Sequence, residues 1–176
     1  MLPQALTYED LLAKFRWTIP ERYNIGVDVC DRWAAAEPDR PAILEVAADG
    51  RITPFSYGLL RDGSNRLANA LRDRGVRRRD RVAVLLPQGR AVPVVHCAVY
   101  KLGAVALPLA ALFGVEALGY RLRDAGAKAV VTNAAGLQKV AALRPELPAL
   151  EMVLCTDERR EPRGRARRRE PGFQPG

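Results

Sequence analysis

The chain has 176 residues, a length that suits one ordinary domain or part of a larger one. Hydrophobic residues make up 48% and charged residues 27%, which excludes a wholly disordered or fibrous protein. The net charge of +8 is uneven, because residues 157–176 hold seven arginines against four acidic residues. The preceding residues are therefore only mildly basic, and net charge alone does not indicate the ordered basic face of a nucleic-acid-binding protein.

Cysteine usage and apolar runs indicate a cytoplasmic protein. Cys30, Cys97 and Cys155 lie far apart in apolar stretches without CxxC spacing, so we expect reduced, buried thiols. Acidic residues at 9–10 interrupt the stretch where a signal peptide would be apolar, so we expect no targeting segment. The apolar run 91–118 is broken by Pro, His, Lys and Gly, and we expect no membrane span.

The first part of the chain predicts helices, a hairpin and a longer amphipathic helix. Helical spacing of apolar residues covers 8–15 and 27–37, with a loop at 17–26. Short strands at 42–46 and 51–54 flank Asp49-Gly50, a strong hairpin signal. The pattern at 56–74 predicts an amphipathic helix that ends at Gly75.

The rest of the chain alternates between strands and helices. Strands are predicted at 82–86, 104–107, 129–132 and 150–155, with helices at 91–102, 115–125 and from Asn133 to about 143. Pro108 is expected to end the second strand. Strands that are apolar on both faces, each followed by a helix, indicate a parallel sheet covered on both sides. The predicted fold class is α/β, a parallel sheet flanked by helices, with a small hairpin and a disordered C-terminal tail.

Individual residues predict neither a catalytic group nor a metal site. His96 is the only histidine and lies among apolar residues of a predicted helix, so we favour a core histidine over a catalytic one. His96 and Cys97 are adjacent and point to different helix faces, which argues against a metal site. The sequence has no Walker-type phosphate loop and no GxGxxG after a strand.

Three short segments have two interpretations each. Leu112-Phe113-Gly114 follows a strand, and its backbone either approaches a ligand or forms a plain strand-to-helix connection, which we slightly favour from the residues alone. Arg77-Arg78-Arg79 either complements a helix C-terminus on the surface, which we favour, or binds phosphate. Arg167-Arg168-Arg169 allows weak nucleic-acid contacts, but it lacks interleaved aromatic residues, so we do not expect nucleic acid as a partner.

Six sequence blocks in order carry a family resemblance: Phe55-Ser-Tyr57, Ser64-Asn-Arg-Leu-Ala-Asn-Ala-Leu71, Arg74-Gly-Val76, Asp80-Arg-Val-Ala-Val-Leu-Leu-Pro87, Lys101-Leu-Gly-Ala-Val-Ala-Leu-Pro-Leu109 and Gly119-Tyr-Arg-Leu-Arg-Asp-Ala-Gly-Ala-Lys-Ala-Val-Val-Thr132. They resemble the N-terminal part of an AMP-dependent (AMP-forming) acyl-CoA synthetase of the adenylate-forming superfamily. Tyr23–Trp33, followed by Pro38–Ala42, resembles the acetyl- and medium-chain branch. The resemblance implies that residues 27–156 are a partial AMP-binding domain. The sequence pattern predicts a helix and loop over residues 1–26 and a basic, disordered tail over residues 157–176.

The resemblance implies a two-step reaction with a carboxylic acid, ATP, Mg²⁺ and coenzyme A. The carboxylate attacks the α-phosphate of ATP to give an acyl-adenylate and pyrophosphate, and the coenzyme A thiol then displaces AMP. The family's phosphate loop and ribose-binding acid belong downstream of the strand that ends at Cys155. We therefore expect no catalytic residue in this chain, no tight cofactor binding and no activity of the chain alone, which leaves its status as an acid-thiol ligase open.

The same resemblance suggests which residues approach coenzyme A. It assigns Leu112, Phe113 and Gly114 to a loop near coenzyme A, and Lys139 to the nucleotide end of that molecule. It also shows a departure: Arg79 stands where the family has a glycine with positive φ, at a cost of about 1 kcal/mol. Two other functions stay open, an interaction module that completes a separately encoded synthetase half and a weak nucleic-acid binder acting through the tail.

Overall fold

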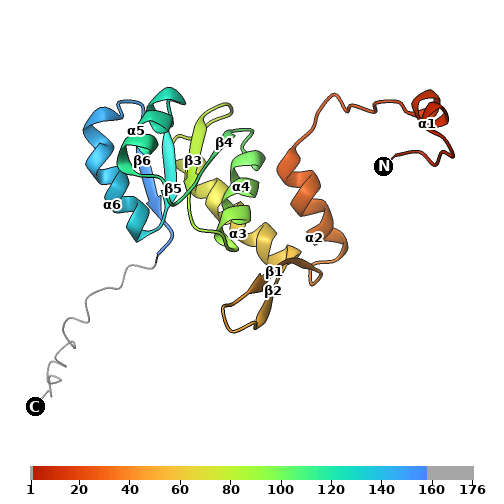
Figure 1. Cartoon of the computed structure of the whole chain (residues 1–176), viewed down its shortest axis with the longest axis horizontal. Coiled ribbons are helices and arrows are strands. Elements are labelled where there is room, and N and C mark those ends of the chain that lie inside the picture. Colours follow the sequence, from red (N-terminus) through yellow and green to blue (C-terminus); the bar gives the residue numbers. More distant parts are fainter. Residues whose placement is uncertain (1, 158–176) are drawn as a thin grey trace, which may run out of the picture.

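A four-stranded parallel sheet with helices on both faces forms the body of the chain, and a small hairpin and an N-terminal arm lie beside it (Figure 1). This computed structural model describes residues 2–157. The elements in chain order are α1 Tyr8–Lys14, the π-helical turn η1 Val27–Asp31, α2 Arg32–Ala36, β1 Pro41–Val46, β2 Ile52–Ser56, α3 Tyr57–Asp73, β3 Arg81–Leu85, α4 Ala91–Lys101, β4 Val105–Leu109, α5 Val115–Asp124, β5 Ala129–Thr132, α6 Ala134–Leu143, the 3₁₀ turn η2 Arg144–Glu146 and β6 Met152–Cys155.

The sheet has the strand order β4-β3-β5-β6, and every pairing is parallel. The connection through α4 leads from β3 to a neighbour on one side, whereas β5 and β6 lie on the other side. The direction of winding therefore changes between β3 and β5. In open α/β sheets, ligands bind outside the carboxyl ends of the strands near such a point.

Alternating side chains of β3 divide the core into two layers. Ala83 and Leu85 pack with α5 and α6, whereas Val82 and Val84 pack with α3 and α4. Both sets are buried, as expected for a sheet that is covered on both faces. The structure therefore confirms the predicted fold class, and β1 and β2 form the predicted antiparallel hairpin across Gly50.

Two element boundaries differ from the prediction. Pro108 does not end β4 but lies within it, opposite Val84 of β3. This is possible because β4 is an edge strand, where proline removes no ladder hydrogen bond on its open side. The second predicted helix begins as the π-helical turn η1 before it continues as α2.

The prediction that all three cysteines are buried is wrong for Cys155. Cys30 and Cys97 are buried, whereas Cys155 is exposed, and all three thiols are free. Cys155 ends β6, which is the outermost strand of the described sheet, so no neighbouring strand covers it.

Residues 158–176, which hold nearly all of the predicted tail, lie outside the described residues. Asp157 still contacts the body, because its Oδ2 accepts a hydrogen bond from the Ala134 amide at 2.8 Å. No helix within residues 2–157 has the length and apolar character needed to cross a bilayer.

Candidate functional site

The loop between β4 and α5 holds three of the four residues expected near a ligand. It follows the carboxyl end of β4, so it lies at the edge of the sheet where ligands are expected. Leu112 is 95% exposed, whereas Phe113 packs against the core on the α5–α6 side. A Cβ atom added to Gly114 would meet no atom within 4 Å, so space is open around this backbone.

Lys139 of α6 holds this loop in place. Its Nζ donates to the carbonyl oxygens of Ala111 and Phe113, each at 2.9 Å. The Arg121 guanidinium of α5 lies 4.3 Å from the centre of the Phe113 ring, a cation–π contact that fixes the ring. The structure therefore brings Lys139 together with the three loop residues, which are 25 to 27 positions away along the chain.

An apolar pocket of about 520 Å³ adjoins the loop. Residues at the carboxyl ends of β3 and β4, in α4 and in the β4–α5 loop line it, including Val84, Leu86, Val92 and Leu112. Gln88 and His96 contribute the polar side chains. A largely apolar cavity with few polar groups at this edge of the sheet suits a small molecule with an apolar part.

His96 borders this pocket, a position that the sequence pattern did not indicate. It is half-buried, and its Nδ1 lies 3.0 Å from the Tyr100 hydroxyl one helical turn away. Burial lowers the pKa of His96 below its ordinary value of 6.5, so the imidazole is neutral at neutral pH. A neutral imidazole accepts or donates a hydrogen bond without placing a charge in the pocket.

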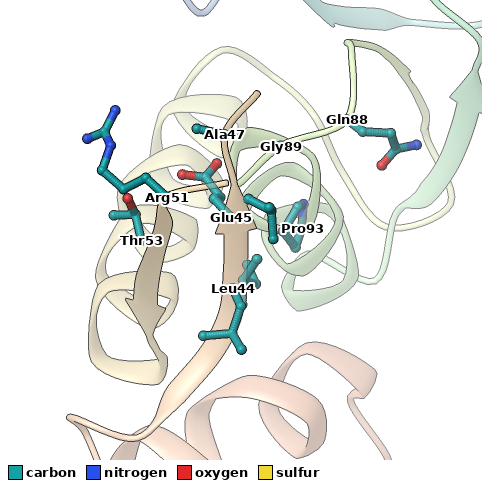
Figure 2. A pocket seen from close by; sticks show the side chains of 10 residues that line it. Leu44, Glu45, Ala47, Arg51, Thr53, Gln88, Gly89 and Pro93 are labelled. Carbon is teal, nitrogen blue, oxygen red and sulfur yellow. The ribbon is translucent and has the colours of Figure 1, made fainter. Parts of the chain in front are cut away.

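A second pocket of about 620 Å³ lies between the β1–β2 hairpin and the β3–α4 loop (Figure 2). Glu45 projects from the hairpin toward the turn at Gly89, whereas the Arg51 side chain points away from it (Figure 2). Glu45 Oε1 accepts a hydrogen bond from the Arg90 amide at 2.8 Å, next to the start of α4. This carboxylate therefore stabilises a helix N-terminus, and Gln88 lines both pockets.

The chain offers little for a metal ion in this region. Among residues 2–157, no group of three or more His, Cys, Asp or Glu side chains is placed to hold one. The described residues therefore do not provide the ligand set of a Mg²⁺ site. The β4–α5 loop and the apolar pocket next to it remain the best candidate for binding a small molecule.

Comparison with known proteins identifies the family. The sequence model described as "AMP-binding enzyme" matches residues 30–174. Acetyl-coenzyme A synthetase of Pasteurella multocida is 32% identical over 155 residues, which cover 86% of this chain and 24% of that protein. The probable non-canonical nonribosomal peptide synthetase CymA of Salinispora arenicola is 34% identical over 140 residues, which cover 80% of this chain and 2% of that protein.

Solved structures agree with the sequence relatives. The crystal structure of Brucella canis acyl-CoA synthetase superposes with a TM-score of 0.71 at 29% identity, covering 86% of this chain and 29% of that one. Acetoacetyl-CoA synthetase of Streptomyces lividans gives a TM-score of 0.66 at 30% identity, covering 74% of this chain and 21% of that one. The chain thus spans less than a third of each of these relatives. On the match of the family model and on this shared fold, the chain belongs to the AMP-binding enzyme family.

Proposed function

We propose that this chain forms the N-terminal part of the large domain of an AMP-forming acyl-CoA synthetase that acts in the cytoplasm. The observation that carries the proposal is the family match over residues 30–174, together with relatives named acetyl- and acyl-CoA synthetases. The free, buried thiols of Cys30 and Cys97 suit a reducing compartment. The substrates of the complete enzyme are a carboxylic acid, ATP and coenzyme A.

The proposed reaction transfers an acyl group in two displacements. A carboxylate oxygen forms a bond to the α-phosphorus of ATP while the bond to pyrophosphate breaks. The coenzyme A sulfur, after loss of its proton, then forms a bond to the acyl carbon while the bond to AMP breaks. Both steps bring anions together, so they need preorganised hydrogen-bond donors and cations around the reacting phosphate.

Within this reaction the present residues position coenzyme A. Leu112, Phe113 and Gly114 form one wall of the path for the coenzyme A arm, and the apolar pocket borders this loop at Leu112. Lys139 acts as a positioning residue, because its ammonium donates hydrogen bonds to the loop carbonyls of Ala111 and Phe113. Its ammonium nevertheless adds positive charge close to the expected nucleotide end of coenzyme A.

We further propose that these residues do not complete the reaction by themselves. The whole sequence contains no Walker-type phosphate loop, and the chain corresponds to 24% of the P. multocida relative. The test is pyrophosphate release by the purified chain with ATP, coenzyme A and a panel of carboxylic acids. We expect no release above a blank, with an intact acetyl-CoA synthetase as the positive control, and sustained turnover would contradict the proposal.

A chimera tests the role of the loop directly. Residues 23–156 would replace the matching segment of the P. multocida enzyme, and an active chimera would then carry Lys139→Met or, as a matched control on the same helix, Gln138→Met. Loss of the Lys139 hydrogen bonds to the β4–α5 loop should raise KM for coenzyme A by about tenfold, and ATP–pyrophosphate exchange should stay unchanged. An equal loss in both activities would assign Lys139 a structural role only.

A second candidate function rests on the open edge of the sheet. β6 pairs with β5 on one side, and within residues 2–157 no strand pairs with its other side. An unpaired strand edge is a template for another strand, so the chain could complete a separately encoded synthetase half. Co-expression with the remaining segment of a relative should then restore solubility and activity, and failure to do so would count against this candidate.

A further inference from the structure

The N-terminal arm, residues 2–23, exposes large apolar side chains. Figure 1 shows that it extends away from the sheet, and α1 within it buries no residue. Leu6 is 100% exposed, and Trp17 and Ile19 are each 80% exposed. Surface apolar residues are usually scattered singly, so a run of them along one arm indicates a surface that contacts a partner.

A basic loop lies between α3 and β3. Residues 72–81 contain six arginines and two aspartates. Asp73 pairs with Arg72, and Asp80 pairs with Lys128 at 2.9 Å. The Asp80 carboxylate also accepts the Arg77 amide at 2.8 Å, which fixes the turn. Arg78 is exposed and has no ion-pair partner among the residues that the structure describes.

The arm and the basic loop share one surface. Arg22 and Tyr23 at the base of the arm line the same hollow as Arg78 and Lys101, with a volume of about 510 Å³. Glu21 is the acidic residue of this hollow, and the Lys101 charge is already paired with Asp31 at 2.6 Å. Arg22 and Arg78 therefore face solvent as cations next to the apolar arm.

This surface lies away from the candidate ligand loop. The basic loop precedes β3 and so sits at the amino ends of the parallel strands, whereas the β4–α5 loop follows their carboxyl ends. A partner at the basic surface would therefore not block the β4–α5 loop.

We propose that the arm and the basic loop form a docking surface for an anionic lipid bilayer. The charges are complementary, because guanidinium groups bind the phosphates and carboxylates of lipid headgroups. Trp17 and Tyr23 suit the interface between headgroups and acyl chains, where amphipathic aromatic rings gather. Leu6 and Ile19 gain from contact with acyl chains, whereas a nucleic acid would offer these aliphatic side chains no matching surface.

Vesicle flotation with the full chain tests the proposal. The probes are vesicles of phosphatidylcholine alone and of phosphatidylcholine with about 30% phosphatidylserine, at about 0.1 M salt. Binding should be at least about tenfold stronger to the anionic vesicles and should weaken as salt rises. Tryptophan emission should shift to the blue on binding, because Trp17 moves from water into the interface.

Three variants locate the surface. Arg22→Gln with Arg78→Gln removes the cations of the hollow, and Trp17→Ser with Ile19→Ser removes the apolar contact. Each double variant should weaken binding at least about fivefold, and Trp17→Ser should abolish the blue shift, since Trp33 is stacked on Tyr57 in the body. The control, Arg51→Gln with Arg144→Gln, removes the same charge elsewhere and should change binding by less than about twofold.

Three outcomes would overturn the proposal. One is an equal effect of the control variant, which would make binding a matter of net charge. Another is binding that neither surface variant reduces, which would assign it to residues 158–176. The third is tighter binding to duplex DNA that the same arginine variant abolishes, which would make the surface a nucleic-acid interface. Circular dichroism of each variant confirms that the fold is retained.

Discussion

Arg79 has a backbone conformation that favours glycine. Its φ is 72°, and it is the single residue other than glycine with positive φ among those described. Its amide nevertheless donates to the Gly103 carbonyl at 3.0 Å, so the turn is held in this form. The family resemblance implies a glycine with positive φ at this position, and Arg79 has kept that backbone conformation.

We therefore expect Arg79→Gly to stabilise the chain. Relief of left-handed strain outweighs the extra entropy of glycine in the unfolded chain, giving a gain of about 0.5–1 kcal/mol in the free energy of unfolding. Urea titration measures this change. The neighbouring Arg78→Gly, at a residue without positive φ, should instead be neutral or destabilising. Equal effects of the two substitutions would contradict the explanation.

His96 gives the chain a pH dependence of defined sign. Burial lowers the pKa of His96 in the folded chain below 6.5, so the unfolded chain binds the proton more readily. The stability that the neutral imidazole provides is complete above about pH 6.5 and decreases as the pH falls through the folded-state pKa. His96→Gln should lose less stability than the parent between about pH 7.5 and about pH 5.5, as measured by urea midpoints. Tyr100→Phe, which keeps the imidazole, should retain the parent pH dependence.

At the scale of elements, the contact of α6 with the sheet depends on a glycine. A Cβ atom on Gly136 would lie 1.9 Å from Thr132 Oγ1 and 3.1 Å from a methyl group of Leu85. Thr132 is itself fixed, because its buried hydroxyl donates to the Leu85 carbonyl at 2.8 Å. The helix can approach the end of β5 this closely only with hydrogen at that position.

Gly136→Ala should therefore destabilise the chain by about 2 kcal/mol through overpacking. Thr132→Ala alone should also be destabilising, because it leaves a buried carbonyl without its donor. In the double variant the new methyl group occupies space that the hydroxyl has left. The double variant should therefore lose about 1 kcal/mol less free energy of unfolding than the sum of the two single losses. Strict additivity in thermal or urea unfolding would show that the two atoms do not compete for one position.

The sequence predicted the elements better than their assembly. Apolar runs and the helix end at Gly75 located the helices and strands, because these signals are local. The order of the strands and the hydrogen bonds from Lys139 to the β4–α5 loop depend on contacts between residues far apart in the sequence, and no local pattern encodes such contacts. The prediction that Pro108 ends its strand was wrong for the same reason, because a strand at the edge of a sheet tolerates proline and an inner strand does not. The roles of Leu112, Phe113, Gly114 and Lys139 therefore stay predictions, whereas their arrangement and the pocket beside them became visible only in the structure.

At the scale of the whole molecule, a partly buried ionic cluster joins the N-terminal segment to the sheet body. Lys101 at the end of α4 is 9% exposed, and its Nζ lies 2.6 Å from Asp31 Oδ1 of η1. The same ammonium donates to Ser64 Oγ at 2.8 Å and to Asn65 Oδ1 at 2.6 Å on α3. Gly26 permits the close approach, because a Cβ there would lie 2.9 Å from the Cys97 carbonyl oxygen.

Loss of this cluster should loosen η1 from the body before the sheet unfolds. Lys101→Met leaves a poorly solvated carboxylate without its partner and should reduce stability by about 3 kcal/mol. Combination with Asp31→Asn should recover part of this loss, because the unpaired charge is then absent, with a coupling of at least about 1 kcal/mol. Hydrogen exchange should show faster exchange of the η1 amides in Lys101→Met and unchanged protection in β3 and β5. Uniformly faster exchange across all elements would instead mean that η1 and the sheet unfold as one cooperative unit.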